Sequence, residues 1–204
     1  METLVAYVLL GVTSVVGLTF IIERAFALRW RRVVPNEIEA AVQSCHTPED
    51  VPMLKRVCEH HKSPMSRLLL AAIEHLDWPK ADNVDAMQTR ARHEMVRLER
   101  GLVVLEIIVG IAPLLGLVGT IVGMMSAFGD VSQSLNNAAK LAKDIATILN
   151  TTLIGLLIAI PSLIFWSYYN KKVEAIAVEM ETLCDEFIRR QYREQAAPSL
   201  VEAK

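Results

Sequence analysis

The chain has 204 residues, of which 52% are hydrophobic and 22% are charged, and its formal net charge is −2. A charge so close to neutral argues against nucleic acid as a partner, because nucleic-acid binding needs a strongly positive surface. The sequence contains no G-x-x-x-x-G-K phosphate loop and no nucleophile elbow, so we do not expect an enzyme. The charged residues are segregated from three long apolar stretches, which is typical of a membrane protein and not of one soluble core.

The three apolar stretches are residues 3–22, 107–129 and 145–170, and none contains Asp, Glu, Lys, Arg or His. A hydrocarbon core about 30 Å thick needs about 20 helical residues at about 1.5 Å each, so each stretch is long enough to cross a bilayer. We therefore predict an all-α integral membrane protein with three transmembrane helices. The second and third are expected to extend into a cytoplasmic helical bundle.

Basic residues set the predicted orientation. No Lys or Arg precedes the first span, whereas Arg24, Arg29, Arg31 and Arg32 follow it. The positive-inside rule therefore places the N-terminus outside and the C-terminus in the cytoplasm. The expected organisation is 1–30 as an N-terminal transmembrane helix, 31–105 as a cytoplasmic helical region, 106–170 as a transmembrane hairpin, and 171–204 as a cytoplasmic C-terminal helix and tail.

Helical periodicity continues beyond the spans. Apolar residues from Ala81 onward predict an amphipathic helix that runs directly into the second span: Val84, Met87, Ala91, Met95, Leu98 and Leu102. A heptad seam follows the third span: Val173, Ile176, Met180, Leu183 and Phe187. A seam needs a partner, and either the chain's own helix over 81–102 or a neighbouring subunit could supply it.

The cysteines give no sign of a metal or disulfide site. Cys45, Cys58 and Cys184 lack disulfide-like spacing and are expected to be reduced thiols. His46 and His60 lie near two of them without a repeated ligand spacing. We expect Cys45, Cys58 and the neighbouring His46, His60 and His61 at the surface of short helices, and we expect no metal and no cofactor.

The centres of the second and third spans are polar but not ionisable. In the second span, small residues recur at intervals of three or four residues and so form a stripe along one helix face: Ala112, Gly116, Gly119, Gly123 and Ala127. Such stripes let membrane helices approach closely. The third span carries a polar group followed by Gly155 and Pro161: Thr147, Asn150, Thr151 and Thr152. A threonine in a membrane helix can simply bond its own i−4 carbonyl, so simple packing and a polar passage both remain open.

The predicted depths of two threonines in the membrane favour a polar passage over simple packing. At helical rise, Thr120 lies roughly 21 Å from Glu106 at the inner edge of the membrane, and Thr152, on the antiparallel helix, lies about 18 Å from the same edge. The two hydroxyls are therefore predicted at nearly the same level, as a ring of hydroxyls around a shared passage would require.

Two segments resemble a known family. They are residues 112–124, APLLGLVGTIVGM, and residues 145–161, IATILNTTLIGLLIAIP, which are similar to the second- and third-span signatures of the MotA/TolQ/ExbB proton channel family. The three-span layout is closer to ExbB and TolQ. The resemblance implies a pentameric ring in the bacterial inner membrane, with its N-terminus periplasmic. It also implies an ExbD- or TolR-like single-span partner, whose membrane aspartate carries the proton, and a TonB- or TolA-like rod that is driven.

Carried over by position, Thr120 and Thr152 match the family's pore threonines. The chain differs at Thr147, where the best-known ExbB proteins have a glutamate, and at Glu106, where others have a small or apolar residue. Hydroxyls do not titrate near neutral pH, so a partner's acid is expected to hold the proton. The expected ion pathway comprises Thr120, Thr152, Thr151, Asn150, Thr147 and Glu106, and the expected helix-packing positions are Gly116, Gly119, Gly123, Gly155, Pro113 and Pro161.

Two functions remain open at this point. One is the proton-channel subunit, in either TonB-type uptake or Tol-type envelope maintenance. The alternative is a non-conducting membrane scaffold or assembly protein that uses the same close-packed helices.

Overall fold

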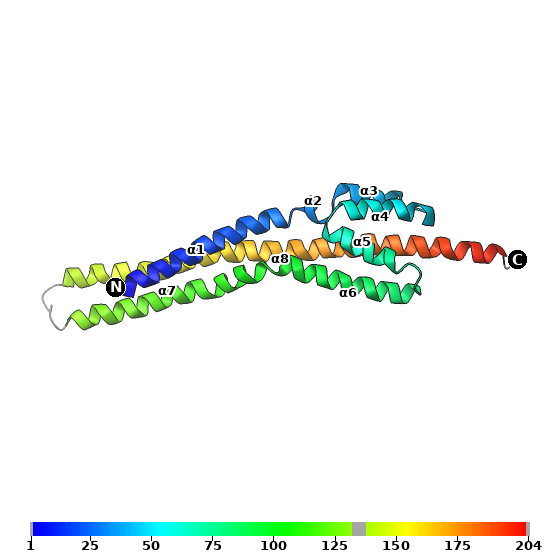
Figure 1. Cartoon of the computed structure of the whole chain (residues 1–204). Helices are drawn as coiled ribbons and strands as arrows, with labels where there is room; N and C mark the ends of the chain where they lie inside the picture. Colours follow the sequence, from blue (N-terminus) through cyan, green and yellow to red (C-terminus); the bar gives the residue numbers. More distant parts are fainter. Residues whose placement is uncertain (1, 132–137, 203–204) are drawn as a thin grey trace. The chain divides into compact units, whose positions relative to one another are not determined.

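The computed structural model describes the backbone of residues 2–131 and 138–202 and the side chains of residues 4–128 and 141–194. Every regular element in these ranges is a helix, and no strand occurs there (Figure 1). The elements in chain order are α1 (Glu2–Ala27), α2 (Trp30–Val33), α3 (Asn36–Ser44), η1 (Pro48–Asp50), α4 (Val51–His60), α5 (Pro64–Glu74), α6 (Lys80–Glu99), α7 (Leu102–Val131) and α8 (Ala138–Glu202). The predicted all-α class is confirmed.

Three of these helices are long and apolar enough to cross a membrane. The candidate segments are Leu4–Ala27 in α1, Leu102–Phe128 in α7 and a window within Leu141–Glu194 of α8. The three predicted spans fall on these three helices. The connection between the second and third spans of the predicted hairpin includes residues 132–137, which lie outside the described part of the chain.

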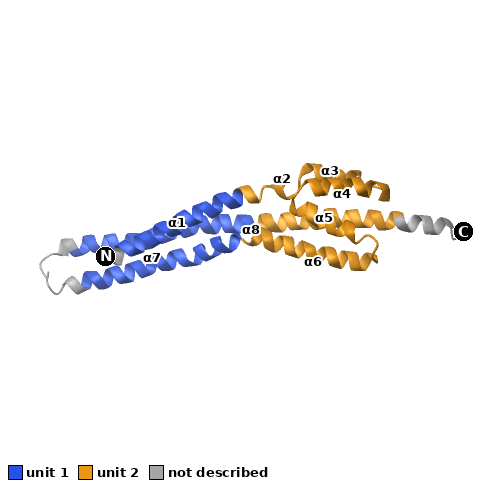
Figure 2. Cartoon of the chain, in the orientation of Figure 1, with its two compact units in different colours: residues 1–25, 101–170 blue, residues 26–100, 171–204 orange. Residues whose placement is uncertain are grey.

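The chain divides into two compact units (Figure 2). The first comprises Met1–Ala25 and Gly101–Asn170 and is called the span unit here, because it holds the apolar segments. The second comprises Phe26–Arg100 and Lys171–Lys204 and is called the bundle unit. The helix α8 contributes to both, since it is continuous from Ala138 to Glu202.

In the span unit, two tyrosines connect α1 to α8. The hydroxyl of Tyr7 donates to the carbonyl of Thr147 at 3.2 Å. The hydroxyl of the buried Tyr169 donates to the carbonyl of Ile21 at 2.9 Å. One bond lies near the beginning of α1 and the other near its end, so together they fix α1 alongside α8.

In the bundle unit, one hydrophobic core surrounds the C-terminal part of α8. The predicted seam is buried: Ile176, Met180, Leu183 and Phe187 are each 5% exposed or less. Their core neighbours come from helices α3 to α6 and from the segment before α3: Val33, Val34, Ile38, Val42, Cys45, Leu54, Cys58, Met65, Leu68, Leu69, Ala72, Met87 and Ala91. The seam therefore packs within its own chain, against several short helices, and the helix over 81–102 contributes two of these residues.

Proline or serine residues lie at the beginning of several short helices of this unit. Pro35 and Pro79 precede α3 and α6 directly. The side chain of Ser63 accepts the N–H of Ser66 at 3.1 Å and caps α5, whose first residue is Pro64. A hydroxyl at this position satisfies one of the amide donors that a helix start leaves unpaired.

A buried carboxylate joins α5 to α6. Glu94, with a side chain 1% exposed, accepts two hydrogen bonds from Arg67, at 3.0 and 2.5 Å, and one from Arg97 at 3.1 Å. Arg90 lies 4.0 Å away. Burial alone would raise the pKa of Glu94, but the hydrogen bonds from Arg67 and the charges of the three arginines offset burial and hold the pKa below its ordinary value.

The predicted continuous helix from 81 into the second span is wrong at one point. Helix α6 ends at Glu99 and α7 begins at Leu102. Gly101 is buried, and a Cβ there would overlap the guanidinium of Arg24. Glycine is a poor helix former, and only a residue without a side chain lets the guanidinium lie against this backbone. The helix is therefore interrupted where the sequence pattern alone continues.

The expected surface position of Cys45 and Cys58 is also wrong. Cys45, Cys58 and Cys184 are all buried and all free, because an unligated thiol behaves as a small apolar side chain. Burial and the nearby charge of Glu59 raise the pKa of Cys58 to about 12, and burial likewise raises the pKa of Cys184.

Candidate ion pathway

Glycines bring α7 and α8 into backbone contact within the span unit. A Cβ on Gly116 would lie 2.9 Å from the Cα of Thr152, and a Cβ on Gly155 would lie 2.6 Å from the carbonyl oxygen of Ala112. Neither distance leaves room for a methyl group. The small residues therefore allow an approach between the two helices that no larger side chain would permit.

The threonines of α8 donate across this contact. Thr152 donates from Oγ1 to the carbonyl of Gly116 at 3.1 Å. The Oγ1 of Thr151 lies 3.3 Å from the same carbonyl oxygen and 2.7 Å from that of Ile148. A hydroxyl has a single proton, so for Thr151 these two bonds are alternatives. Thr152 is thus the threonine whose described hydrogen bond runs entirely between helices.

The other two threonines bond within their own helices. Thr120 donates from Oγ1 to the carbonyl of Leu117 at 2.7 Å, and Thr147 donates to that of Lys143 at 3.0 Å. Gly119, beside Thr120, faces Thr151, since a Cβ on Gly119 would lie 3.1 Å from the hydroxyl oxygen of Thr151. Thr120 is therefore within about one turn of Thr152 along the helix axes, roughly 3 Å in depth.

Asn150 lies on a different face of α8. Two residues further along a helix correspond to a rotation of roughly 200°, so Asn150 points away from the face that carries Thr152. Its side chain is exposed, whereas that of Thr151 is buried against α7. The structure thus brings Thr120, Thr151 and Thr152 together and leaves Asn150 apart from them.

Glu106, Pro113 and Pro161 are the remaining residues that were predicted for the ion pathway and for helix packing. Glu106 is exposed near the start of α7 and makes no ion pair or side-chain hydrogen bond within the described residues. It shares a stripe of α7 with the half-buried Pro113 and with Thr120, because the three are spaced by seven residues, or about two turns. Pro161 of α8 is exposed.

Some contacts of the span unit were missed in the sequence. Gly17 is buried, and a Cβ there would lie 3.5 Å from a side-chain carbon of Ile108 and 3.6 Å from the hydroxyl oxygen of Ser162. Gly17 lies outside the small-residue stripe of α7, and its spacing from Gly11 and Ser14 does not indicate which helices it meets. Gly123, by contrast, belongs to the predicted stripe, and a Cβ there would lie 2.8 Å from a side-chain carbon of Ile148.

The site can therefore offer hydroxyls and carbonyls but no proton carrier. The three apolar stretches, residues 3–22, 107–129 and 145–170, hold no Asp, Glu, Lys, Arg or His, and Glu106 directly precedes the second of them. These features define a polytopic helical membrane protein whose close-packed helix pair presents non-ionisable polar groups at membrane depth.

Comparison with known proteins gives the family. The sequence pattern of the MotA/TolQ/ExbB proton channel family matches residues 60–182 of this chain, which is more than half of it. The chain belongs to that family, a family of channel and transport proteins rather than of enzymes. The resemblance found in the two span motifs is confirmed.

Individual relatives agree. The chain is 32% identical over 164 residues to the putative biopolymer transport protein ExbB-like 1 of Synechocystis sp., covering 74% of this chain and 61% of that protein. It is 25% identical over 197 residues to ExbB-like 3 of the same organism, covering 94% of this chain and 93% of that protein. It is 33% identical over 103 residues to the Tol-Pal system protein TolQ of Pseudomonas aeruginosa, covering 50% and 45%.

Proposed function

We propose that this chain is the channel-forming subunit of an inner-membrane complex that converts the proton-motive force into mechanical work. One observation carries the proposal. The hydroxyl of Thr152 and that of Thr151 meet one backbone carbonyl, that of Gly116, between helices packed through glycine. Membership of a proton channel family supports the same function.

The threonines are proposed to serve as hydrogen-bond acceptors. A hydroxyl that donates its proton to a backbone carbonyl still has lone pairs. The Oγ1 atoms of Thr120 and Thr152 can therefore accept a hydrogen bond from the O–H group of a neutral carboxylic acid, which keeps its proton. A hydrogen bond to the neutral form of an acid favours that form, so such contacts would stabilise the protonated acid at mid-membrane. The acid itself belongs to an ExbD- or TolR-like single-span partner, because this chain has none at that depth.

The remaining pathway residues take positions along this route. Glu106, on the same stripe of α7 as Thr120, would receive protons at the cytoplasmic mouth. Thr147 and Thr151 would extend the polar lining, and Asn150, from its separate face, would contact water or a neighbouring subunit. Each proton that crosses about 100 mV supplies roughly 2.3 kcal/mol, so a few protons can drive a substantial conformational change.

The proposed assembly is a pentameric ring around the partner helices, with the N-terminus in the periplasm and residues 31–105 and 171–204 in the cytoplasm. The work is delivered to a TonB- or TolA-like rod. The identities to an ExbB-like protein over most of this chain and to TolQ over half of it support both kinds of rod.

Proton flux tests the proposal. The full chain is reconstituted in vesicles with a coexpressed single-span partner, and acidification is followed with a pH-sensitive dye under an imposed potential. Replacing Thr120 and Thr152 together by valine should lower the partner-dependent flux at least tenfold, since valine keeps the volume and removes the acceptors.

A matched control lies on α1. Thr13 and Thr19 each donate to their own i−4 carbonyl at 2.8 Å, so their double valine variant should retain flux. Unchanged flux in the Thr120 and Thr152 double variant would overturn the assignment of the passage. Absence of flux in the unmodified complex, with the partner bound, would favour the non-conducting scaffold instead.

A further inference from the structure

A basic pocket lies in the bundle unit, outside the candidate ion pathway. It has a volume of about 540 Å³ and is lined by Arg29, Trp30, Arg31, Arg32 and Lys172. Four of these five side chains are cationic, and no carboxylate belongs to the lining. A pocket of this size falls within the range of ordinary ligand sites.

The arginines of this pocket have no acidic partner among the side chains that the structure describes. None of Arg29, Arg31 and Arg32 forms an ion pair with a described Asp or Glu. Arg29 instead lies 6.0 Å from the centre of the Phe26 ring. The bundle unit pairs several of its other arginines with carboxylates, as Arg67 and Arg97 with Glu94 illustrate. Several like charges gathered around one hollow repel each other, and a bound anion would relieve that repulsion.

The position of the pocket in the sequence points to the source of the anion. Arg29 follows the apolar segment of α1, which ends at Ala27, and Lys172 follows the apolar stretch that ends at Asn170. Trp30 is 39% exposed, and tryptophan beside a span is typical of the level of the lipid headgroups. Basic pockets immediately beyond membrane helices bind anionic headgroups, and the planar fork of arginine matches phosphate oxygens in pairs.

We propose that this pocket binds the phosphate of an anionic phospholipid headgroup, such as phosphatidylglycerol. Arg31 and Arg32 supply the forked donors, Arg29 and Lys172 supply additional positive charge, and Trp30 packs against the glycerol backbone. The proposal requires only that the spans are inserted in a bilayer, so it stands or falls independently of proton conduction.

Thermal unfolding tests the proposal. The full chain is purified in an uncharged detergent, stripped of lipid, and melted with added phosphatidylglycerol, with phosphatidylcholine, or with inorganic phosphate. Phosphatidylglycerol at about 100 times its Kd should raise Tm by about 5 °C or more, because ligand that binds the folded state stabilises it. Phosphatidylcholine and inorganic phosphate should give no comparable rise.

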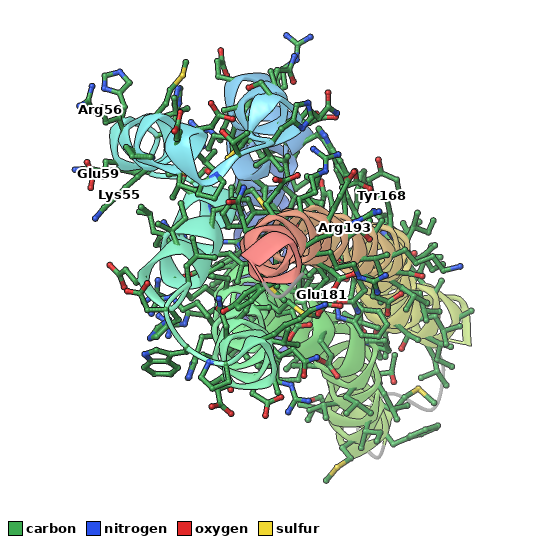
Figure 3. All side chains as sticks on the ribbon, turned by 90° about the vertical axis from the view of Figure 1, so that its right-hand side faces the viewer. Lys55, Arg56, Glu59, Tyr168, Glu181 and Arg193 are labelled. Carbon is green, nitrogen blue, oxygen red and sulfur yellow. The ribbon has the colours of Figure 1, made fainter. Side chains whose placement is uncertain are left out.

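Two variants localise the effect. Replacing Arg31 and Arg32 by glutamine should remove at least half of the rise. A control with the same loss of charge is available on α4, where Lys55 and Arg56 are exposed and point away from the helix in Figure 3. The variant with Lys55 and Arg56 replaced by glutamine should keep the full rise.

A lysine variant protects the test against failed insertion. Replacing Arg31 and Arg32 by lysine keeps the positive-inside signal and removes the forks. The number of phosphatidylglycerol molecules retained in native mass spectra should then fall at least threefold. A full rise in Tm with the glutamine variant, or unchanged lipid retention with the lysine variant, would overturn the proposal. An equal rise with inorganic phosphate alone would assign the pocket to a free anion and would also overturn it.

Discussion

Replacing Gly155 by alanine tests how α7 and α8 are held together. The new methyl carbon would lie 2.6 Å from the carbonyl oxygen of Ala112. That oxygen belongs to the backbone, so it cannot move aside as the end of a side chain could. The two helices would have to separate by several tenths of an ångström at this point.

The expected loss of stability in Gly155→Ala can be worked out from the packing and the hydrogen bond that this separation disturbs. Inserting a methyl group into a well-packed site costs about 1–3 kcal/mol. The bond from Thr152 to Gly116 is already 3.1 Å long, and a further separation of this size weakens or breaks it. Interhelical hydrogen bonds in membranes contribute about 0.6–2 kcal/mol. We therefore expect the free energy of unfolding to fall by about 2–4 kcal/mol.

A glycine on the same pair of helices provides the control. A Cβ on Gly110 of α7 would meet nothing within 4 Å, so Gly110→Ala should be neutral or stabilising by up to about 1 kcal/mol through helix propensity. The assay is unfolding of the purified full chain in mixed micelles with increasing SDS, followed by circular dichroism. Equal midpoints for Gly155→Ala and Gly110→Ala would refute the close approach of the two helices.

The remaining predictions concern Glu94 and the buried cysteines of the bundle unit. Glu94→Gln should lower the free energy of unfolding by about 2–3 kcal/mol, since the Arg67 charge loses its partner, whereas Glu99→Gln at an exposed position should change it little. The folded pKa of Glu94 is lowered, so its contribution should be complete above the ordinary carboxyl range and lost as pH falls through the folded pKa; the variant should flatten the acid side of the stability profile. For Cys58 the pKa is raised to about 12, so its contribution should be lost as pH rises above about 8.5. Iodoacetamide at pH 8 should modify Cys58 and Cys184 slowly until urea is added, as read by mass spectrometry, and fast modification of the folded chain would contradict their burial.

The apolar stretches could be predicted from the sequence because a span needs only length and the absence of charge. The glycine stripe likewise identifies the face of α7 that meets another helix. Periodicity cannot decide which hydroxyl crosses between helices. Thr151 and Thr152 are adjacent in sequence, and only the spacing between backbones determines that Thr152 reaches the Gly116 carbonyl while Thr151 also has that of Ile148 within reach.

In the bundle unit, the sequence predicts which face of α8 is buried, but it does not predict which helices pack against that face. The seam of α8 correctly indicates which residues are buried, but a heptad pattern carries no information about whether one long helix or several short ones cover it. At the break, Gly101 contacts the guanidinium of Arg24, which is distant in sequence and near in space. Such long-range contacts leave no local pattern in the chain.

The hydroxyls of Thr120, Thr147 and Thr152 each donate to a backbone carbonyl. The apolar stretches that carry them, residues 107–129 and 145–170, hold no Asp, Glu, Lys, Arg or His. Within the proposed mechanism, a copy that lacks its partner has no acidic or basic side chain in these stretches to carry a proton across the membrane. A cell could therefore produce this chain ahead of its partner without dissipating the potential on which its energy supply depends.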